Sequence, residues 1–462
     1  MGLSTAMEIG KSGLNVYRVA TEVTGENIAN VNTPGYSRQR AILESAPPTN
    51  ANGFPLGTGV NISTVERYYD GLLQLQIANS QTTLGYDTTK STVLQQIEPA
   101  FNEIQNDGTG AAISNFFASW QDLTLNPTGT SERQTVITTA QTLSDNFHIV
   151  SKTLSDTVSI QNSSLVPLVD SINATLTNIA QLNSQIRTTE LLAGNANEIR
   201  DQRDLLVRDL STQIGITFTE NSDGTTDIRF TDGGAALVTG ATAGAFSLDK
   251  TDPNSFVVQL TPVGGALAQV TPTKGNLGAI LALRDTIIPG YQKQVDELAA
   301  MITTQVNTQH LAGFDLNGNP GIALFDPAAT TAATFGLNSA IVNDTSLIAA
   351  SSSPILTGDN GNALLIAGLQ NQKLMTGGTL TFNGAWDSLV SEVSLDVASS
   401  KTAVSQDEAF SNQLNTLRES NSGVSLDEEL TNLIMYQRSY QACAQLITTA
   451  TAMMDVVLGM IR

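Results

Sequence analysis

Cysteine and histidine are both scarce in this chain of 462 residues. Cys443 is the one cysteine, so no disulfide can form within the chain. The two histidines, His148 and His310, have no second histidine or cysteine at ligand spacing, which argues against a zinc site or a histidine-dependent catalytic site. We expect each histidine at a helix surface or at an interface between helices.

Charge is also sparse, and positive charge most of all. Charged residues make up 14% of the chain, against about 25% in an ordinary soluble protein. The 22 Lys and Arg residues face 43 Asp and Glu residues, which gives a net charge of −21. No basic run offsets this balance locally, so neither nucleic acid nor anionic lipid is an expected partner.

Segments that would direct the chain into a membrane are lacking as well. Residues 1–11 have no basic stretch followed by an apolar core, as a cleaved signal peptide would. No uninterrupted apolar run approaches the roughly 18–20 residues that span a bilayer. We expect a soluble chain with no membrane partner, whose export would use a route that reads no cleaved signal.

Proline divides the chain into helical outer parts and a turn-rich middle. None of the 14 prolines falls in residues 168–252 or after Pro354, whereas seven lie from Pro253 to Pro354. This predicts a mainly α fold with a β-rich insert: paired terminal helices forming a coiled coil, a bundle of long helices and an outward middle domain containing β-strands. The expected units are 1–35 (N-terminal axial helix, paired with 425–462), 36–213 (loop, short strands and long-helix bundle), 214–275 (β-rich outer domain), 276–312 (returning helix), 313–385 (turn-rich outer segment), 386–424 (bundle helix) and 425–462 (C-terminal axial helix).

The C-terminal helix carries a regular stripe. Ser425 and Glu428 have the spacing of a capping box at its start. Stripe positions then alternate at four and three residues, a mean period of 3.5 that keeps one seam toward a partner helix. They are Leu426, Leu430, Leu433, Gln437, Tyr440, Ala444, Ile447, Thr451, Met454, Leu458 and Ile461.

The N-terminal helix carries a weaker stripe of the same period, which ends where Thr33-Pro34-Gly35-Tyr36 predicts a type II turn. Its positions are Leu3, Met7, Gly10, Leu14, Tyr17, Thr21, Thr24, Ile28 and Val31. Either helix alone would leave a long apolar strip in water, so we expect the two ends to pair with each other. The period alone leaves open whether the stripes are satisfied within one subunit or only when neighbouring subunits cover them.

Between the ends, long helices alternate with a short β-rich stretch. Two helices are expected at Glu132–Asn162 and Pro167–Leu192, separated at the proline, and others at 197–214 and 277–310. From Ile214 the apolar period changes to two, and Asn221–Gly224 turns the chain back toward Phe230, which predicts a hairpin. Further strands are expected at Ala245–Leu248, Phe256–Leu260 and Leu380–Phe382.

Two charged motifs are candidates for a functional site. Within Asp201-Gln202-Arg203-Asp204, the spacing of Asp204 from Arg200 and Arg208 predicts an ion-pair ladder on a solvated or interhelical face. Asp315–Gly321 is weakly similar to a calcium loop, but Pro320 stands where that loop needs glycine, so a plain turn is expected. We expect no catalytic, cofactor-binding or metal-binding residues and no enzymatic activity.

Two segments resemble known signatures. Asn27-Ile28-Ala29-Asn30-Val31-Asn32-Thr33-Pro34-Gly35-Tyr36-Ser37-Arg38-Gln39 resembles the N-terminal signature of the bacterial flagellar rod, hook and hook-associated axial proteins. Residues 423–434, with Tyr436-Gln437 and Tyr440-Gln441-Ala442, resemble the matching C-terminal signature. The chain looks most like the hook-associated members, because residues 36–39, 423–429, 116–123, 201–204 and 283–291 also fit them. The resemblance thins at about 215–275 and 320–385.

The resemblance implies which residues serve assembly. At the N-terminal end these are Asn27, Ile28, Ala29, Asn30, Thr33, Pro34, Gly35, Tyr36, Ser37, Arg38 and Gln39. At the C-terminal end they are Leu426, Leu430, Leu433, Gln437, Tyr440, Ile447, Met454 and Leu458.

The resemblance also implies a role: a structural adaptor that joins the flagellar hook to the filament, outside the cell. Such a protein leaves the cell unfolded through the flagellar type III export apparatus and assembles as a layer on the distal end of the hook. Its implied partners are the hook protein, the second hook–filament junction protein, further copies of itself and an export chaperone. A hook or distal-rod protein of the same family is a close alternative, and a secreted coiled-coil protein with an enzymatic or glycan-binding insert is a more distant one.

Overall fold

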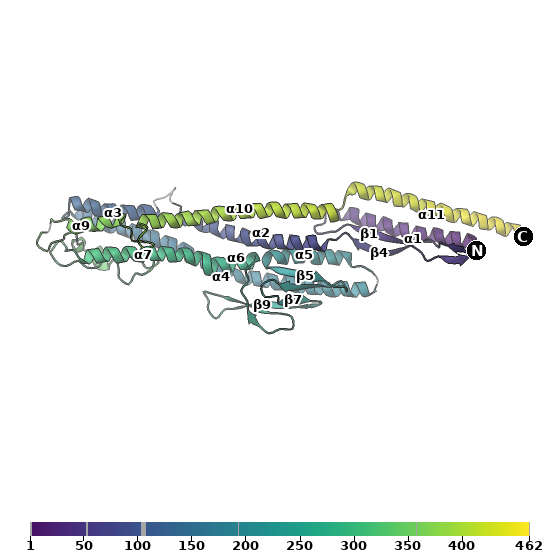
Figure 1. Cartoon of the computed structure of the whole chain (residues 1–462), viewed down its shortest axis with the longest axis horizontal. Coiled ribbons are helices and arrows are strands. Elements are labelled where there is room, and N and C mark those ends of the chain that lie inside the picture. The colour runs from purple at the N-terminus through teal and green to yellow at the C-terminus, as the bar shows by residue number, and fades with distance from the viewer. Residues whose placement is uncertain (1, 52–53, 103–107, 193, 357, 462) are drawn as a thin grey trace.

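The computed structural model is an elongated, mostly helical rod that narrows at one end (Figure 1). It describes residues 2–51, 54–102, 108–192, 194–356 and 358–461. Both termini lie at the narrow end, whereas the wider part holds the long helices and most of the strands. The predicted fold class, mainly α with a β-containing middle region, is confirmed.

The bounds of the elements are as follows. The α-helices are α1 (Gly2–Ala29), α2 (Gly71–Ile97), α3 (Thr109–Leu125), α4 (Thr130–Leu192), α5 (Asn197–Gln213), α6 (Gly275–Ala282), α7 (Ile288–Leu311), α8 (Ser339–Asn343), α9 (Gly361–Gly368), α10 (Phe382–Ser422) and α11 (Leu426–Ile461), and a π-helical turn at Leu283–Ile287 joins α6 to α7. The strands are β1 (Gln39–Ser45), β2 (Thr49–Ala51), β3 (Phe54–Leu56), β4 (Val60–Arg67), β5 (Ile216–Glu220), β6 (Thr226–Phe230), β7 (Ala236–Thr239), β8 (Thr242–Ala243), β9 (Ala245–Asp249), β10 (Val257–Thr261) and β11 (Ala268–Gln269).

The narrow end is built from α1, α11 and the strands β1–β4, which we call the terminal unit. Helices α1 and α11 lie side by side and antiparallel (Figure 1). A Cβ added to Gly10 would lie 2.6 Å from Ile447, and one added to Gly13 would lie 2.6 Å from the sulfur of Cys443. The two helices therefore approach closely because these glycines have no side chain.

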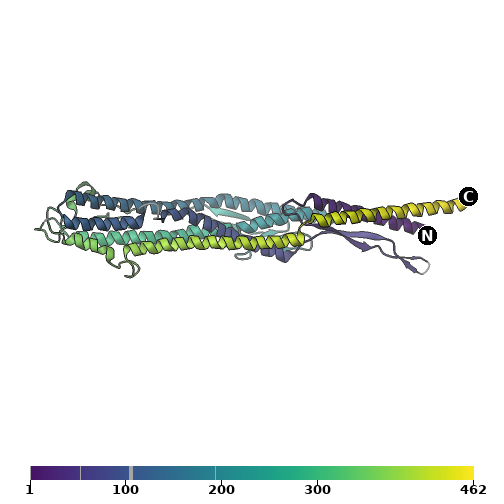
Figure 2. The same ribbon diagram turned by 90° about the horizontal axis from the view of Figure 1, so that it is seen from above.

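Helix α1 has a second partner in the antiparallel hairpin of β1 and β4, in which Gln39 pairs with Arg67 and Ser45 with Val60. Figure 2 shows this hairpin leaving the side of the helix pair at its tip. Because α1 packs on two sides, its buried positions are not those of the predicted stripe. They are Gly10, Gly13, Val16, Ala20, Thr24 and Asn27, of which Gly10 and Thr24 were predicted.

The predicted seam of α11 is also offset from the face that contacts α1. Leu433, Ile447 and Met454 are partly buried as predicted, but Leu426, Leu430, Gln437, Tyr440 and Leu458 are exposed. The contact with α1 runs through Tyr436, Cys443 and Ala450, together with Ile447 of the predicted stripe. The predicted seam therefore faces α1 only in part, and most of its large apolar side chains lie outside the contact.

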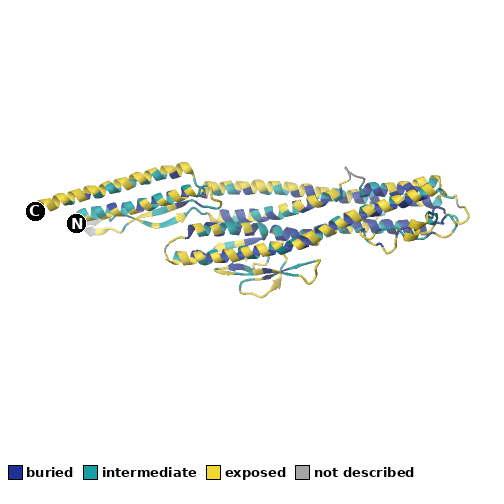
Figure 3. Cartoon of the chain, turned by 180° about the vertical axis from the view of Figure 1, so that it is seen from behind, coloured by how far each residue is buried: buried dark blue, intermediate teal, exposed yellow. Residues whose placement is uncertain are grey.

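This outward face of α11 is long and apolar, and Figure 3 shows it as exposed along the helix. Within Phe382–Met460, one 18-residue window reaches a mean hydropathy of 1.4 with 6% of it buried, enough to cross a membrane by length and composition alone. Helix α11 has no uninterrupted apolar run of this length, because threonines such as Thr448, Thr449 and Thr451 stand among its apolar residues.

The long helix α4 corrects a second expectation. Two helices were predicted to meet at Pro167, but α4 runs for 63 residues with Pro167 inside it. A proline within a helix costs about 3 kcal/mol, because it removes one backbone hydrogen bond and crowds the preceding turn. Leu165 and Val169, on either side of it, are buried in one hydrophobic core, and this packing keeps the helix continuous.

Two large hydrophobic cores and one small cluster of Leu73, Ile77 and Leu414 lie along the described part of the rod. The distal core, at the end far from the termini, joins α3, α7, the first halves of α4 and α10 and the segment that precedes α10. The second core packs the far half of α4 and α5 against the strands β5–β10. Residues 313–385, expected as an outer segment, send Leu324, Phe325 and Phe335 fully into the distal core, so that expectation was wrong for their apolar side chains.

The strands β5–β11 form two small antiparallel sheets on α4, which we call the β unit. One sheet has the order β5-β6-β7-β8 and the other β11-β10-β9. The predicted hairpin is β5–β6, with Ile216 opposite Phe230, and the strands expected near 245 and 256 are β9 and β10. The strand expected at 380–382 was wrong, because the Thr381 hydroxyl accepts from the Gly384 N–H and caps the start of α10.

Candidate functional site: the joint between the terminal unit and the rod

The N-terminal signature segment lies where the terminal unit meets the rod, and Asn27 is its centre. This buried side chain donates to the Gln39 carbonyl at 2.9 Å and to the Glu429 carboxylate at 3.1 Å. Its amide oxygen accepts from the Tyr36 hydroxyl and from the Gln39 N–H, both at 2.9 Å. One asparagine thus ties together the end of α1, the start of β1 and the first turn of α11.

Arg38 makes a second link between the two ends of the chain. Its guanidinium lies 2.6 Å from Glu428 and 2.7 Å from Glu429, and its backbone N–H donates to the Ser422 carbonyl at 2.8 Å. Glu428, expected in a capping box with Ser425, therefore forms an ion pair with Arg38. The neighbouring carboxylates raise the pKa of Arg38, although burial opposes them.

The turn before Arg38 has the predicted form. Gly35 has a φ of +85°, and the Tyr36 N–H donates to the Thr33 carbonyl at 3.2 Å, as in a type II turn. Arg418, near the end of α10, donates to the Gly35 carbonyl at 2.9 Å. A crevice of about 570 Å³ separates residues 30–38 from the short α10–α11 connection.

Helix α5 supplies the rod's side of the joint. Asp201, which is 5% exposed, accepts from the Ser37 N–H at 2.7 Å and from Arg67 at 2.9 Å. Asp204 accepts from the same Arg67 guanidinium at 2.7 Å. Burial raises the pKa of Asp201, and Arg67 and the Ser37 N–H offset part of that rise.

Gln39 completes the contact with α5. Its side-chain amide donates to Glu198 at 2.8 Å and accepts from Asn197 at 2.9 Å. The expected solvated or interhelical ladder was therefore wrong for Asp201 and Asp204, which bind Arg67 at the end of β4. Arg200, expected beside Asp204, pairs instead with Glu190 and Glu220.

The signature residues therefore have different roles. Asn27, Tyr36, Ser37, Arg38 and Gln39 come together in the joint, whereas the C-terminal set is spread along α11. Arg67, Glu198 and Arg418 were not predicted, and Asp201 was expected on a solvated or interhelical face. A usable signal was the cluster of charge in residues 198–208, which stands out in a chain with 14% charged residues.

His310 and the Asp315 loop are parts of the distal core. His310 is fully buried on α7 and packs against Trp120 of α3, so of the two expected placements the interface between helices is the one observed: Nδ1 contacts the Ile322 carbonyl and Nε2 accepts from the Ala349 N–H at 2.9 Å. Burial lowers its pKa to about 4. Asp315 accepts from the N–H groups of Asn317 and Asn319, each at 2.8 Å, so its carboxylate closes the expected turn.

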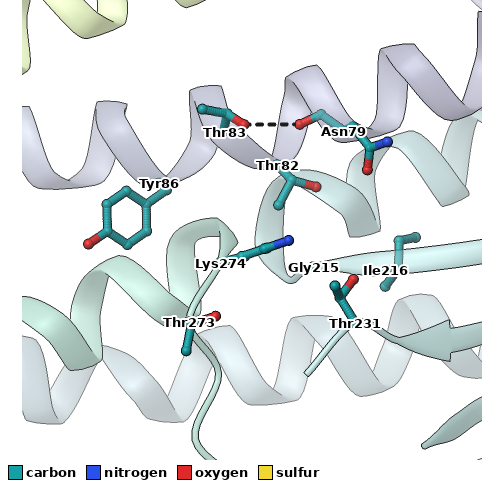
Figure 4. A pocket seen from close by; sticks show the side chains of 9 residues that line it. All are labelled: Asn79, Thr82, Thr83, Tyr86, Gly215, Ile216, Thr231, Thr273 and Lys274. Atoms are coloured by element: carbon teal, nitrogen blue, oxygen red, sulfur yellow. Dashed lines mark hydrogen bonds between the residues drawn. The ribbon is translucent and has the colours of Figure 1, made fainter. Parts of the chain in front are cut away.

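A groove of about 450 Å³ lies between α2, the start of β5 and the start of α6 (Figure 4). Its lining residues are Asn79, Thr82, Thr83, Tyr86, Gly215, Ile216, Thr231, Thr273 and Lys274. The hydroxyl groups of Thr82, Thr83 and Thr273 donate to neighbouring protein atoms: the carbonyls of 78 and 211, the carbonyl of 79, and the carboxylate at 232. These bonds hold the walls of the groove together.

The comparisons with known proteins place this geometry in a family. Residues 94–325, half of the chain, match the family model of the flagellar hook-associated protein FlgK helical domain. The ends match two models of flagellar rod proteins: residues 7–36 that of the basal body rod protein, and residues 418–460 that of the FlgEFG C-terminal region.

Whole-length relatives agree with these matches. The chain is 28% identical to flagellar hook-associated protein 1 of Bacillus subtilis, over 99% of this chain and 98% of the relative, and 27% identical to that of Escherichia coli, over 99% and 100%. The solved FlgK of Burkholderia pseudomallei has the same fold, with a TM-score of 0.67 at 19% identity, over 75% of this chain and 100% of that one. The chain belongs to the flagellar hook-associated protein FlgK family, whose members are structural proteins of the flagellum.

Proposed function

We propose that this protein is the adaptor between the flagellar hook and the filament, and that it assembles as a layer on the distal end of the hook. Its partners would be the hook protein, the second hook–filament junction protein, further copies of itself and an export chaperone. It would reach this extracellular site by flagellar type III export. The family assignment supports this proposal, as does the absence of any possible intrachain disulfide from a chain that must be threaded unfolded.

The main support for the proposed assembly is the outward face of α11. Leu430 is 48% exposed, Ile434 53% and Leu458 59%, on a helix whose other face is already occupied by α1. Burying a fully exposed leucine contributes about 1.5–3 kcal/mol, so covering even half of each of three such side chains gives several kcal/mol for each subunit. We propose neighbouring copies of the terminal unit as the cover, because α11 is net acidic, with Arg438 as its one basic residue against Asp427, Glu428, Glu429 and Asp455, and an anionic bilayer would repel it.

The test is assembly in a strain that lacks the native gene. The full chain with Leu430→Glu should be exported and fold, yet fail to support filaments, because a charge on this face cannot be covered by an apolar neighbour. The matched control is Leu395→Glu on α10, where the leucine is 70% exposed and lies on the rod. Filaments with Leu430→Glu, or equal loss with both variants, would refute the proposed role of this face.

The alternative roles give different results in the same strain. Loss of the gene should leave hooks without filaments, whereas a hook or distal-rod protein would leave no hook. The match of residues 94–325 to the hook-associated helical domain favours the first outcome. Flotation of the pure protein with lipid vesicles tests the bilayer as the cover of α11: co-flotation that Leu430→Glu abolishes would contradict a protein cover.

A further inference from the structure

Three asparagines on α4 hold the β unit by its backbone. Asn162 donates to the Pro253 carbonyl at 2.9 Å and accepts from the Phe256 N–H at 2.8 Å. Asn173 donates to the Phe246 carbonyl and accepts from the Phe246 N–H, both at 2.8 Å.

The third residue, Asn183, serves two strands. It accepts from the Thr226 N–H at 3.0 Å and donates to the carbonyls of Thr226 and Gly240, each at 2.8 Å. Each of the three side chains thus uses both its amide NH₂ and its oxygen on main-chain groups. Because the groups that are bound in the β unit are all main-chain groups, the contact identifies a position along a strand and is indifferent to the side chain there.

The three positions follow the helix in order. They are 11 and 10 residues apart, so they stand about 16 Å and 15 Å apart along the axis. They meet the approach to β10, then β9, then the start of β6 with the turn after β7, and Figure 1 shows these strands lying along α4. The helix therefore contacts both sheets of the β unit at fixed points.

Burial makes the loss of these hydrogen bonds costly. Asn183 is 0% exposed and Asn162 is 2% exposed, so a mismatched amide there would leave polar groups without partners. Slipping a strand by one residue would both break the pair of bonds and turn its apolar side chains, such as Phe246, out of the core.

The same arrangement recurs elsewhere in the rod. On α7, Asn307 donates to the Phe325 carbonyl and accepts from the Phe325 N–H, both at 2.9 Å, and it is 8% exposed. Arg284, from the π-helical turn, also supports the first contact by donating to the oxygen of Asn162 at 2.9 Å and to the Phe256 carbonyl at 2.7 Å.

We propose that α4 is a template for the β unit: Asn162, Asn173 and Asn183 set the register of its strands and hold it on the rod as a module that opens separately from the distal core. Sheets of such short strands gain their stability by packing against a helix. The helix supplies fixed points for both sheets, and the module can open without disturbing α3 or α7, which belong to the distal core.

Hydrogen exchange of the full chain tests this proposal. Asn183→Ala should lower the protection of β6 and β7 amides by about tenfold to a hundredfold, because it removes three buried hydrogen bonds and leaves their partners unpaired. Amides of α3 and α7 should keep their protection. Asn173→Ala, at a less buried position, should act in the same way on β9 and provides the test if Asn183→Ala does not fold.

The control is Asn146→Ala on the same helix, since the Asn146 amide donates to the Thr142 carbonyl one turn earlier. It should leave β-unit protection within about twofold of the parent protein. An equal loss of protection in the β unit and in α3 and α7 would overturn the proposal, as would unchanged protection of β6, β7 and β9 in the asparagine variants.

Discussion

Removal of Arg67 should open the joint. Its guanidinium side chain is 5% exposed, lies 2.9 Å from Asp201 and 2.7 Å from Asp204, and stacks over the Tyr69 ring at 4.2 Å. Arg67→Leu would leave Asp201 buried without its cation, and would leave Asp204 with Arg203, 3.2 Å away, as its remaining cation. Removing one partner from a buried ion pair costs about 3–5 kcal/mol, mostly from the charge left behind. We therefore expect Arg67→Leu to be less stable than the parent chain by about that amount at pH 7.

The pH dependence gives this prediction a sign. Without Arg67, burial raises the pKa of Asp201 further above that of the unfolded chain, so the penalty of its buried charge is present above this raised pKa and shrinks as the pH falls through it. The deficit, measured by urea denaturation with circular dichroism, should be smaller at pH 5 than at pH 7.

The matched control is Arg40→Leu on β1, where Arg40 is 54% exposed and lies 3.8 Å from Glu66, and it should cost about 0.5 kcal/mol or less. A deficit below about 1 kcal/mol for Arg67→Leu, or one equal to that of Arg40→Leu, would refute our account of the joint.

Two further predictions concern the distal core and the helix pair. The pKa of His310 is about 4 in the fold and about 6.5 in the unfolded chain. Its contribution to the free energy of unfolding is therefore fully present above pH 6.5 and is lost as the pH falls toward 4, up to about 3 kcal/mol. In thermal melts His310→Gln should lose this pH dependence, whereas His148→Gln, at an exposed position, should keep it. Gly13→Ala should destabilise the contact of α1 with α11, since the new Cβ would lie 2.6 Å from the sulfur of Cys443. Gly25→Ala places its Cβ in open space and should stabilise α1 by about 0.5–1 kcal/mol. A higher melting temperature for Gly13→Ala than for Gly25→Ala would contradict the packing described.

Local patterns in the sequence were enough for much of the fold. The stripe after Ser425 predicted α11, and the change of period at Ile214 predicted the hairpin β5–β6. Pro167 led to the wrong prediction of two helices in place of α4. The cost of a proline is local, whereas the packing of Leu165 and Val169 that outweighs it comes from strands more than 40 residues later. The same reason explains the missed offset of the α11 seam, which depends on contacts with α1 at the other end of the chain.

The joint was only half predictable. The resemblance identified Asn27 and residues 36–39, but their partners Glu429 and Asp201 lie 402 and 164 residues away in the chain. A helix-face argument can say that Asp204 and Arg208 lie one turn apart on α5. It cannot show that Arg67 is the cation for which Asp201 is positioned, because that contact exists only once the hairpin β1–β4 is in place.

The polar character of the joint has a consequence for temperature. Apolar association weakens on cooling, so the proposed apolar contacts along α11 should become weaker at low temperature. The hydrogen bonds of Asn27 and the ion pairs of Arg38 and Arg67 do not draw on that driving force. On cooling, the terminal unit should therefore stay attached to the rod, while the proposed contacts of α11 with neighbouring subunits weaken first.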